Sequence, residues 1–190
     1  MTTNLSIKTA TSFILLCTVL GVLCQNLQRS ARAQTPSSLK AFFDTVLRNP
    51  STLPKFEDLH ALAEAIPNMR SEDIKTALPT IFEALAYQDE HVKAYACAAL
   101  FAIAGRQDGA KLLENRIEAI GHDLLSTRFA HIQGGEVIIL GRLKPPPPEA
   151  AHFLLAFVSQ RDRDPNAQGG AIFELLRTGS QNSELIAAVN

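Results

Sequence analysis

The stretch DEHVKAYACAALFAIAG, from Asp89 to Gly105, decides the fold of this chain. Aspartate is a preferred first residue of a helix because its carboxylate accepts hydrogen bonds from the free amides of the first turn. The interior is rich in alanine and leucine, which are strong helix formers. Gly105 then stands where helices commonly end. The stretch therefore predicts a helix, and its alanines predict close packing against a neighbouring helix.

The rest of the chain from Thr35 onward follows the same period. Apolar residues recur at helical spacing, and no segment alternates apolar and polar residues over the length of a strand. Ser71 is expected to cap one of these helices, and Pro79 is expected to kink it. The predicted helices cover residues 39–47, 56–66, 71–87, 89–105, 110–120, 126–141, 148–158, 164–179 and 184–189.

Helix starts and ends recur at a regular spacing. The predicted second helices of three pairs start at residues 89, 126 and 164 and end at Gly105, Gly141 and Gly179, so the spacings lie between 36 and 38 residues. Helix pairs that recur at such a period are typical of solenoids, in which each pair buries its apolar face by stacking on its neighbours.

The stretch from Asp89 to Leu100 resembles the second helix of a HEAT repeat, with its turn aspartate, a valine, a basic residue and then alanines and leucine. The later copies depart from this pattern, since Ser126 and Phe129 replace the aspartate and the valine. The resemblance implies an all-α, right-handed α-solenoid of about four stacked helix pairs. Residues 71–190 would form the HEAT-like repeats and residues 34–70 an N-terminal pair or cap. An armadillo-like or irregular helical stack is the alternative.

Residues 1–33 read as a signal peptide. Lys8 precedes an apolar run from Ala10 to Leu23, which is shorter than the roughly 20 residues that span a bilayer. Small residues at Ala31 and Ala33 predict cleavage that leaves Gln34 as the N-terminus. We therefore expect a secreted or periplasmic protein, and an uncleaved membrane anchor is the alternative.

Charge and composition exclude some classes of function. The chain is 46% hydrophobic and 19% charged, which is typical of a globular protein. Its net charge is −1, and removal of residues 1–33, with three basic and no acidic residues, takes it to −4. A nucleic-acid partner is not expected, because phosphate backbones require a basic surface.

No pattern in the sequence indicates catalysis, a cofactor or a metal. The five histidines lack zinc-ligand spacing, and no nucleophile elbow or metalloprotease helix is present. Cys97 alone follows the predicted signal peptide, so no intramolecular disulfide is expected. Its alanine neighbours predict a buried, unreactive thiol.

The sequence therefore favours a non-catalytic scaffold that binds a protein partner in the cell envelope. The resemblance places the binding surface on the second helices, where we expect polar side chains to be exposed and their replacement to affect binding rather than stability. The candidates are Lys93, Arg128, His131, Glu136, Gln168 and Glu174. A membrane-tethered accessory subunit of an envelope complex, and an enzyme related to bilin lyases, are the alternatives.

Overall fold

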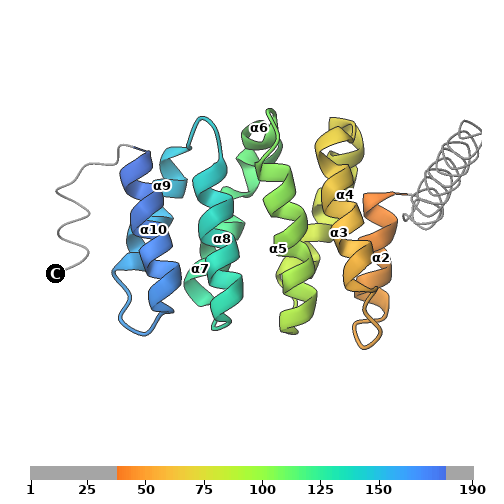
Figure 1. Cartoon of the computed structure of the whole chain (residues 1–190), viewed down its shortest axis with the longest axis horizontal. Coiled ribbons are helices and arrows are strands. Elements are labelled where there is room, and N and C mark those ends of the chain that lie inside the picture. The colour runs from red at the N-terminus through yellow and green to blue at the C-terminus, as the bar shows by residue number, and fades with distance from the viewer. Residues whose placement is uncertain (1–37, 179–190) are drawn as a thin grey trace, which may run out of the picture. The chain divides into compact units, whose positions relative to one another are not determined.

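The computed structural model describes residues 38–178, and every regular element in this range is a helix (Figure 1). The predicted all-α class is confirmed. The predicted signal peptide and the predicted helix at 184–189 lie outside the described residues. The helices are α2 (Leu39–Arg48), α3 (Phe56–Ala65), α4 (Ser71–Leu85), α5 (Glu90–Ala104), α6 (Gly109–Leu113), α7 (Ile117–Ser126), α8 (Ala130–Arg142), α9 (Pro148–Val158) and α10 (Pro165–Arg177), with 3-10 turns η1 (Ile66–Asn68) and η2 (Glu114–Arg116).

The helices pack as adjacent pairs in a solenoid-like stack. Helix α4 packs on α2 and α5, while α5, α8 and α10 lie side by side in one row (Figure 1). Helix α7 packs on both α8 and α9, and α9 packs on α10. Each pair thus covers an apolar face of the next, which is the arrangement expected of a repeat structure.

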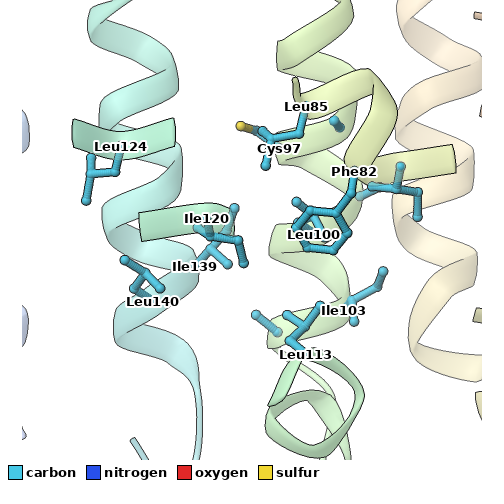
Figure 2. Close-up of a cluster of buried hydrophobic side chains, with 14 of the residues drawn as sticks. Phe82, Leu85, Cys97, Leu100, Ile103, Leu113, Ile120, Leu124, Ile139 and Leu140 are labelled. Atoms are coloured by element: carbon cyan, nitrogen blue, oxygen red, sulfur yellow. The ribbon is translucent and has the colours of Figure 1, made fainter. Parts of the chain in front are cut away.

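One apolar core runs through these pairs. Figure 2 shows its central part, where Phe82 and Leu85 of α4 and Leu100 of α5 lie near Ile120 of α7 and Ile139 of α8. These side chains are almost completely buried. Burial of a side chain of this size stabilises a fold by roughly 1.5–3 kcal/mol, so contacts between pairs are the main support of the stack.

The predicted cap at Asp89 is present, Asp164 caps a further helix, and the predicted cap at Ser71 is absent. The carboxylates of Asp89 and Asp164 accept hydrogen bonds from first-turn amides of α5 and α10. Ser71 is instead the first residue of α4, after the N-cap Arg70, and its hydroxyl donates to Asp108. The predicted Ser71 cap was therefore wrong, because a carboxylate from a distant loop competes for the hydroxyl.

The predicted helix at 110–120 is broken in the structure. Helix α6 packs on α5, and α7 starts anew at Ile117 and packs on α8 and α9. A single straight helix would not reach both sets of neighbours. Gly109 fixes the close approach of α6, because a Cβ atom there would lie 2.4 Å from the carbonyl oxygen of Ile103.

The start of α8 also differs from the prediction. Residues up to Ser126 belong to α7, and the hydroxyl of Ser126 bonds to the Asp123 carbonyl instead of capping a new helix. Helix α8 begins at Ala130, after the N-cap Phe129. The N-caps of α5, α8 and α10 are therefore residues 89, 129 and 164, and the repeat is less regular than the sequence spacing suggested.

Arginine side chains tie the connections of neighbouring pairs together. Nη1 of Arg106 donates to the carbonyl oxygens of Ile66, Pro67 and Met69 at 2.7, 3.0 and 2.9 Å. Hydrogen bonds from Arg106 are also the largest cause that lowers the pKa of Asp108 to about 2.

Arg163 forms a second tie of this kind. It donates to the carbonyl oxygens of Thr127, at 2.6 Å, and of Leu125. Both arginines thus donate to backbone carbonyls at or near helix ends, where acceptors lack partners within the helix.

Among residues 38–178, no helix is both long enough and apolar enough to cross a bilayer.

Candidate functional site

The six polar residues predicted to face a partner do not share one environment. Arg128 and His131 are exposed, and Gln168 and Glu174 are half-buried. Lys93 is only 6% exposed and Glu136 is completely buried. The prediction that Lys93 and Glu136 are exposed was wrong, so neither side chain can contact a partner at this surface.

Lys93 is the centre of a buried ionic contact between three helices. Its ammonium group donates to both carboxylate oxygens of Asp123 in α7, at 2.5 and 2.7 Å, and to the carbonyl oxygen of Leu85 at the end of α4, at 2.5 Å. Charge-assisted hydrogen bonds of this length are strong, and all three ammonium protons have an acceptor. Lys93 therefore holds α5 against α4 and α7.

Glu136 lies beside this ionic contact. Neither of its carboxyl oxygens has a hydrogen-bond partner, although both are buried. Burial is the largest cause that raises the pKa of Glu136 well above its ordinary range, and the charge of Asp123 raises it further. Protonation removes the cost of burying a second carboxylate next to Asp123. Burial thus favours the neutral form of Glu136 in the core.

Replacement of Glu136 by glutamine is expected to change how stability depends on pH. Because the pKa of Glu136 is raised by folding, the folded state retains a proton that the unfolded state releases, and stability falls as pH rises above the ordinary glutamate value. This slope is about 1.4 kcal/mol per pH unit until Glu136 ionises in the folded state. Glu136→Gln should remove it and be the more stable form at neutral and alkaline pH.

Denaturant unfolding of both proteins between about pH 5 and pH 9, which brackets the expected range, measures this difference. Glu118→Gln, an exposed glutamate on α7, is the control and should follow the wild-type curve. Parallel curves for the Glu136 variant and the wild type would show that Glu136 is charged throughout.

A repeated position explains why Lys93 and Gln168 point inward. Each is the fourth residue after the N-cap of its helix, and Gln133 has this position in α8. Gln133 donates to the Thr127 carbonyl at 2.8 Å, and Gln168 donates to the Gln160 carbonyl at 2.6 Å. The position therefore bonds the start of each second helix to the end of the helix before it. Counting four residues from the N-caps Asp89 and Asp164 would have identified this inward-facing position from the sequence.

The burial of Glu136 was not predicted, for a related reason. It is the seventh residue after its N-cap, where α5 has Ala96 and α10 has Ala171, and all three are 0% exposed. The start of α8 at Ala130 had to be known before this equivalence appeared. Glu174 is largely covered and accepts a hydrogen bond from Arg177 at 2.8 Å.

The solvent-exposed side of α5, α8 and α10 has a composition unlike the rest of the described surface. Four exposed large apolar side chains lie on these three helices. Phe101, on α5, is 37% exposed, and the centroid of its ring lies 3.9 Å from the Cζ atom of Arg142. Ile138, Phe173 and Leu176 are 42%, 62% and 54% exposed. We call this surface the α5/α8/α10 face.

Equivalent positions on the face carry equivalent residue types. Ile138 and Phe173 are each the ninth residue after the N-cap, and Gly134 and Gly169 are each the fifth. A Cβ atom at either glycine would have no neighbour within 4 Å. The glycines are therefore not needed for packing between these helices, and they leave open space in front of the backbone.

A groove of about 360 Å³ lies between α8 and α10 on this face. Its lining includes the buried Val137 and Ala167, the half-buried Gly170, and the exposed His131 and Ile138. An apolar groove with a few polar groups at its edge is suited to bind an apolar side chain and to orient it.

Cys97 is buried, as predicted, with 7% of its surface exposed. Burial is the largest cause that raises its pKa well above the ordinary range, and Glu136 and Asp123 add to it. The thiolate is the nucleophilic form, so the folded protein disfavours reaction.

A thiol reagent is therefore expected to label Cys97 slowly in the native protein and rapidly in denaturant. Mass spectrometry of the modified peptide over time measures both rates. Ala98→Cys in a Cys97→Ala background is the control, because residue 98 is partly exposed. Equal native rates at both positions would place Cys97 within reach of solvent.

Within residues 38–178, no three histidine, cysteine, aspartate or glutamate side chains come together in a way that could hold a metal ion.

Comparison with known proteins supports the fold and leaves the family open. No protein-family model matches the chain, and no curated protein matches it either. Among solved structures, the chain is similar to an engineered protein, target OR366 of the Northeast Structural Genomics Consortium. The two share 20% identity with a TM-score of 0.52, over 81% of this chain and 69% of that chain. Likeness at this identity concerns the fold alone.

Proposed function

We propose that this chain is an exported HEAT-like scaffold that binds a protein partner through the α5/α8/α10 face. The observation that carries the proposal is the gathering of four exposed large apolar side chains, Phe101, Ile138, Phe173 and Leu176, on one face. An exposed apolar patch costs solubility, and such patches commonly mark interaction sites.

The arrangement of the helices supports the HEAT-like assignment. Helices α4 and α5, α7 and α8, and α9 and α10 are consecutive and packed together. In each of these three pairs, the side chain of Lys93, Gln133 or Gln168 donates to a backbone carbonyl at or just after the end of the preceding helix. A stack of this kind presents a row of second helices as a continuous surface for a partner.

Site-specific photo-crosslinking tests the proposal in the cells that produce the protein. A benzoylphenylalanine at residue 138 or 173 is expected to form an adduct with a protein partner. The same probe at Glu118 or His152, which are exposed on α7 and α9, should not form it. Ile138→Asp should abolish the adduct formed at residue 173, because a carboxylate in the apolar groove opposes burial.

Equal adduct formation at the face and at the control positions would contradict the assignment of the binding surface. Variants are compared by circular dichroism and thermal melting, so that loss of the adduct is not confused with loss of the fold.

The export part of the proposal depends on residues 1–33. Cleavage after Ala33 would leave a protein that starts at Gln34, and retention of the apolar run would leave a membrane-tethered subunit instead. Mass spectrometry of the N-terminus of the protein from its producing cells distinguishes the two.

A further inference from the structure

A second hollow adjoins the groove between α8 and α10. It has a volume of about 810 Å³ and lies where the α7–α8 and α9–α10 connections meet. Ala130 and Asp164 line both the groove and this hollow, so the two are adjacent, and we call them together the depression. Its wall includes Arg128, Arg161 and Arg163. The depression therefore has an apolar part and a part rich in arginine.

The arginines of the hollow differ in how they are held. Arg163 is fixed by its bonds to Thr127 and Leu125 and by the side chain of Gln160. Arg128 and Arg161 are exposed, and neither has a hydrogen bond or an ion pair with a residue in the described range 38–178. Two guanidinium groups are thus free to receive carboxylates in a bidentate manner.

Carboxylates of the chain itself do not cancel this charge. Asp164 is engaged as the cap of α10, where it accepts from the Ala167 amide at 2.9 Å. Asp162 is the other acidic residue in the wall, against three arginines. The N-terminus of α8 at Ala130 adds positive potential, because its N-cap Phe129 provides no side-chain acceptor for the first-turn amides.

We propose that this depression binds a segment of a partner protein in which an apolar side chain is adjacent to acidic side chains. The apolar side chain lies in the groove against Val137 and Ile138, and aspartate or glutamate side chains pair with Arg128 and Arg161. The two arginines come from different connections, which suits several acidic side chains better than one terminal carboxylate. This inference rests on the proposed function and adds the chemistry of the partner.

Selection from a random peptide library displayed on phage, against the purified full chain, tests the inference. The enriched peptides are expected to contain aspartate or glutamate next to leucine, isoleucine or phenylalanine. Synthetic peptides of the enriched sequence are then measured by fluorescence anisotropy. Arg128→Ala and Arg161→Ala should each weaken binding roughly tenfold, as expected for the loss of a charge-assisted contact.

Matched variants separate this site from general attraction of charge. Arg48→Ala removes an exposed arginine at the end of α2 and should leave the affinity unchanged. Ile138→Asp should abolish binding through the apolar part. Peptides with glutamine in place of the acidic residues should bind as weakly to the wild type as the acidic peptides bind to the double variant Arg128→Ala, Arg161→Ala.

Three results would overturn the inference: no enrichment, enrichment without acidic residues, or binding that Arg128→Ala and Arg161→Ala leave unchanged. Adducts at residue 138 together with any of these results would leave the proposed function intact and refute only the chemistry of the partner. Absence of both the adducts and the peptide binding would refute the proposed function as well.

Discussion

Replacement of Lys93 by alanine is expected to lower the free energy of unfolding by about 3–5 kcal/mol, the usual cost of removing one partner of a buried ion pair. The substitution leaves the Asp123 carboxylate without its cation, the Leu85 carbonyl without a donor, and Glu136 next to an unpaired negative charge. It also removes an aliphatic stem from the core. Urea denaturation followed by circular dichroism measures the difference.

Two further variants identify the cause of this loss. Lys75→Ala removes an exposed lysine whose ion pair with Glu72 lies on the surface, and it should change stability by less than about 1 kcal/mol. The double variant Lys93→Met, Asp123→Leu replaces the buried pair by apolar groups and should recover most of the lost stability. A Lys93→Ala protein as stable as Lys75→Ala would show that the ionic contact does not support the fold.

Deletion of residues 164–190 is expected to lower the melting temperature by more than about 10 °C or to cause aggregation. Helix α10 packs on both α8 and α9, so its removal exposes buried side chains such as Val137, Leu154 and Phe157. Each contributes roughly 1.5–3 kcal/mol by its burial, against a total stability of about 5–15 kcal/mol. Differential scanning calorimetry checks this expectation.

A pair of point substitutions on α10 provides the matched comparison. Leu175 is completely buried and Phe173 is 62% exposed, although they lie on the same helix. Leu175→Asp should destabilise the protein nearly as strongly as the deletion, whereas Phe173→Asp should leave the melting temperature almost unchanged. Unchanged melting after the deletion would show that α10 is an independent appendage and would refute the stacked arrangement.

Local signals predicted most of the fold. The N-cap of α5 at Asp89, and the starts of α9 and α10 at prolines, depend on the geometry of one or two residues, which can be read directly from the sequence. The break before Ile117 and the start at Ala130 depend on which neighbours each segment must reach. Tertiary packing determines these two helix boundaries, and no capping or helix-breaking residue in the sequence marks them.

The candidate site was predictable only in part. Arg128 and His131 line the depression, although Arg128 lies in the α7–α8 connection and not on the second helix to which the sequence assigned it. Lys93 and Glu136 were misplaced because polarity was taken to mean exposure, while their environment is set by Asp123, which lies 30 residues from Lys93 in the chain. Arg161 was not a candidate, since it belongs to a connection and not to a second helix.

The ties formed by Arg106 and Arg163 have a consequence for how such a chain can vary. Both arginines donate to backbone carbonyls, at residues 66 to 69 and at residues 125 and 127. Every amino acid supplies a carbonyl, so these connections can change their side chains without losing the bond, as long as their length and path are kept. Substitutions at exposed positions there, such as Pro67, are therefore expected to be tolerated, whereas insertions or deletions of single residues are expected to uncouple adjacent pairs. Over evolution, such a stack can exchange or duplicate whole helix pairs more easily than it can alter the turns between them.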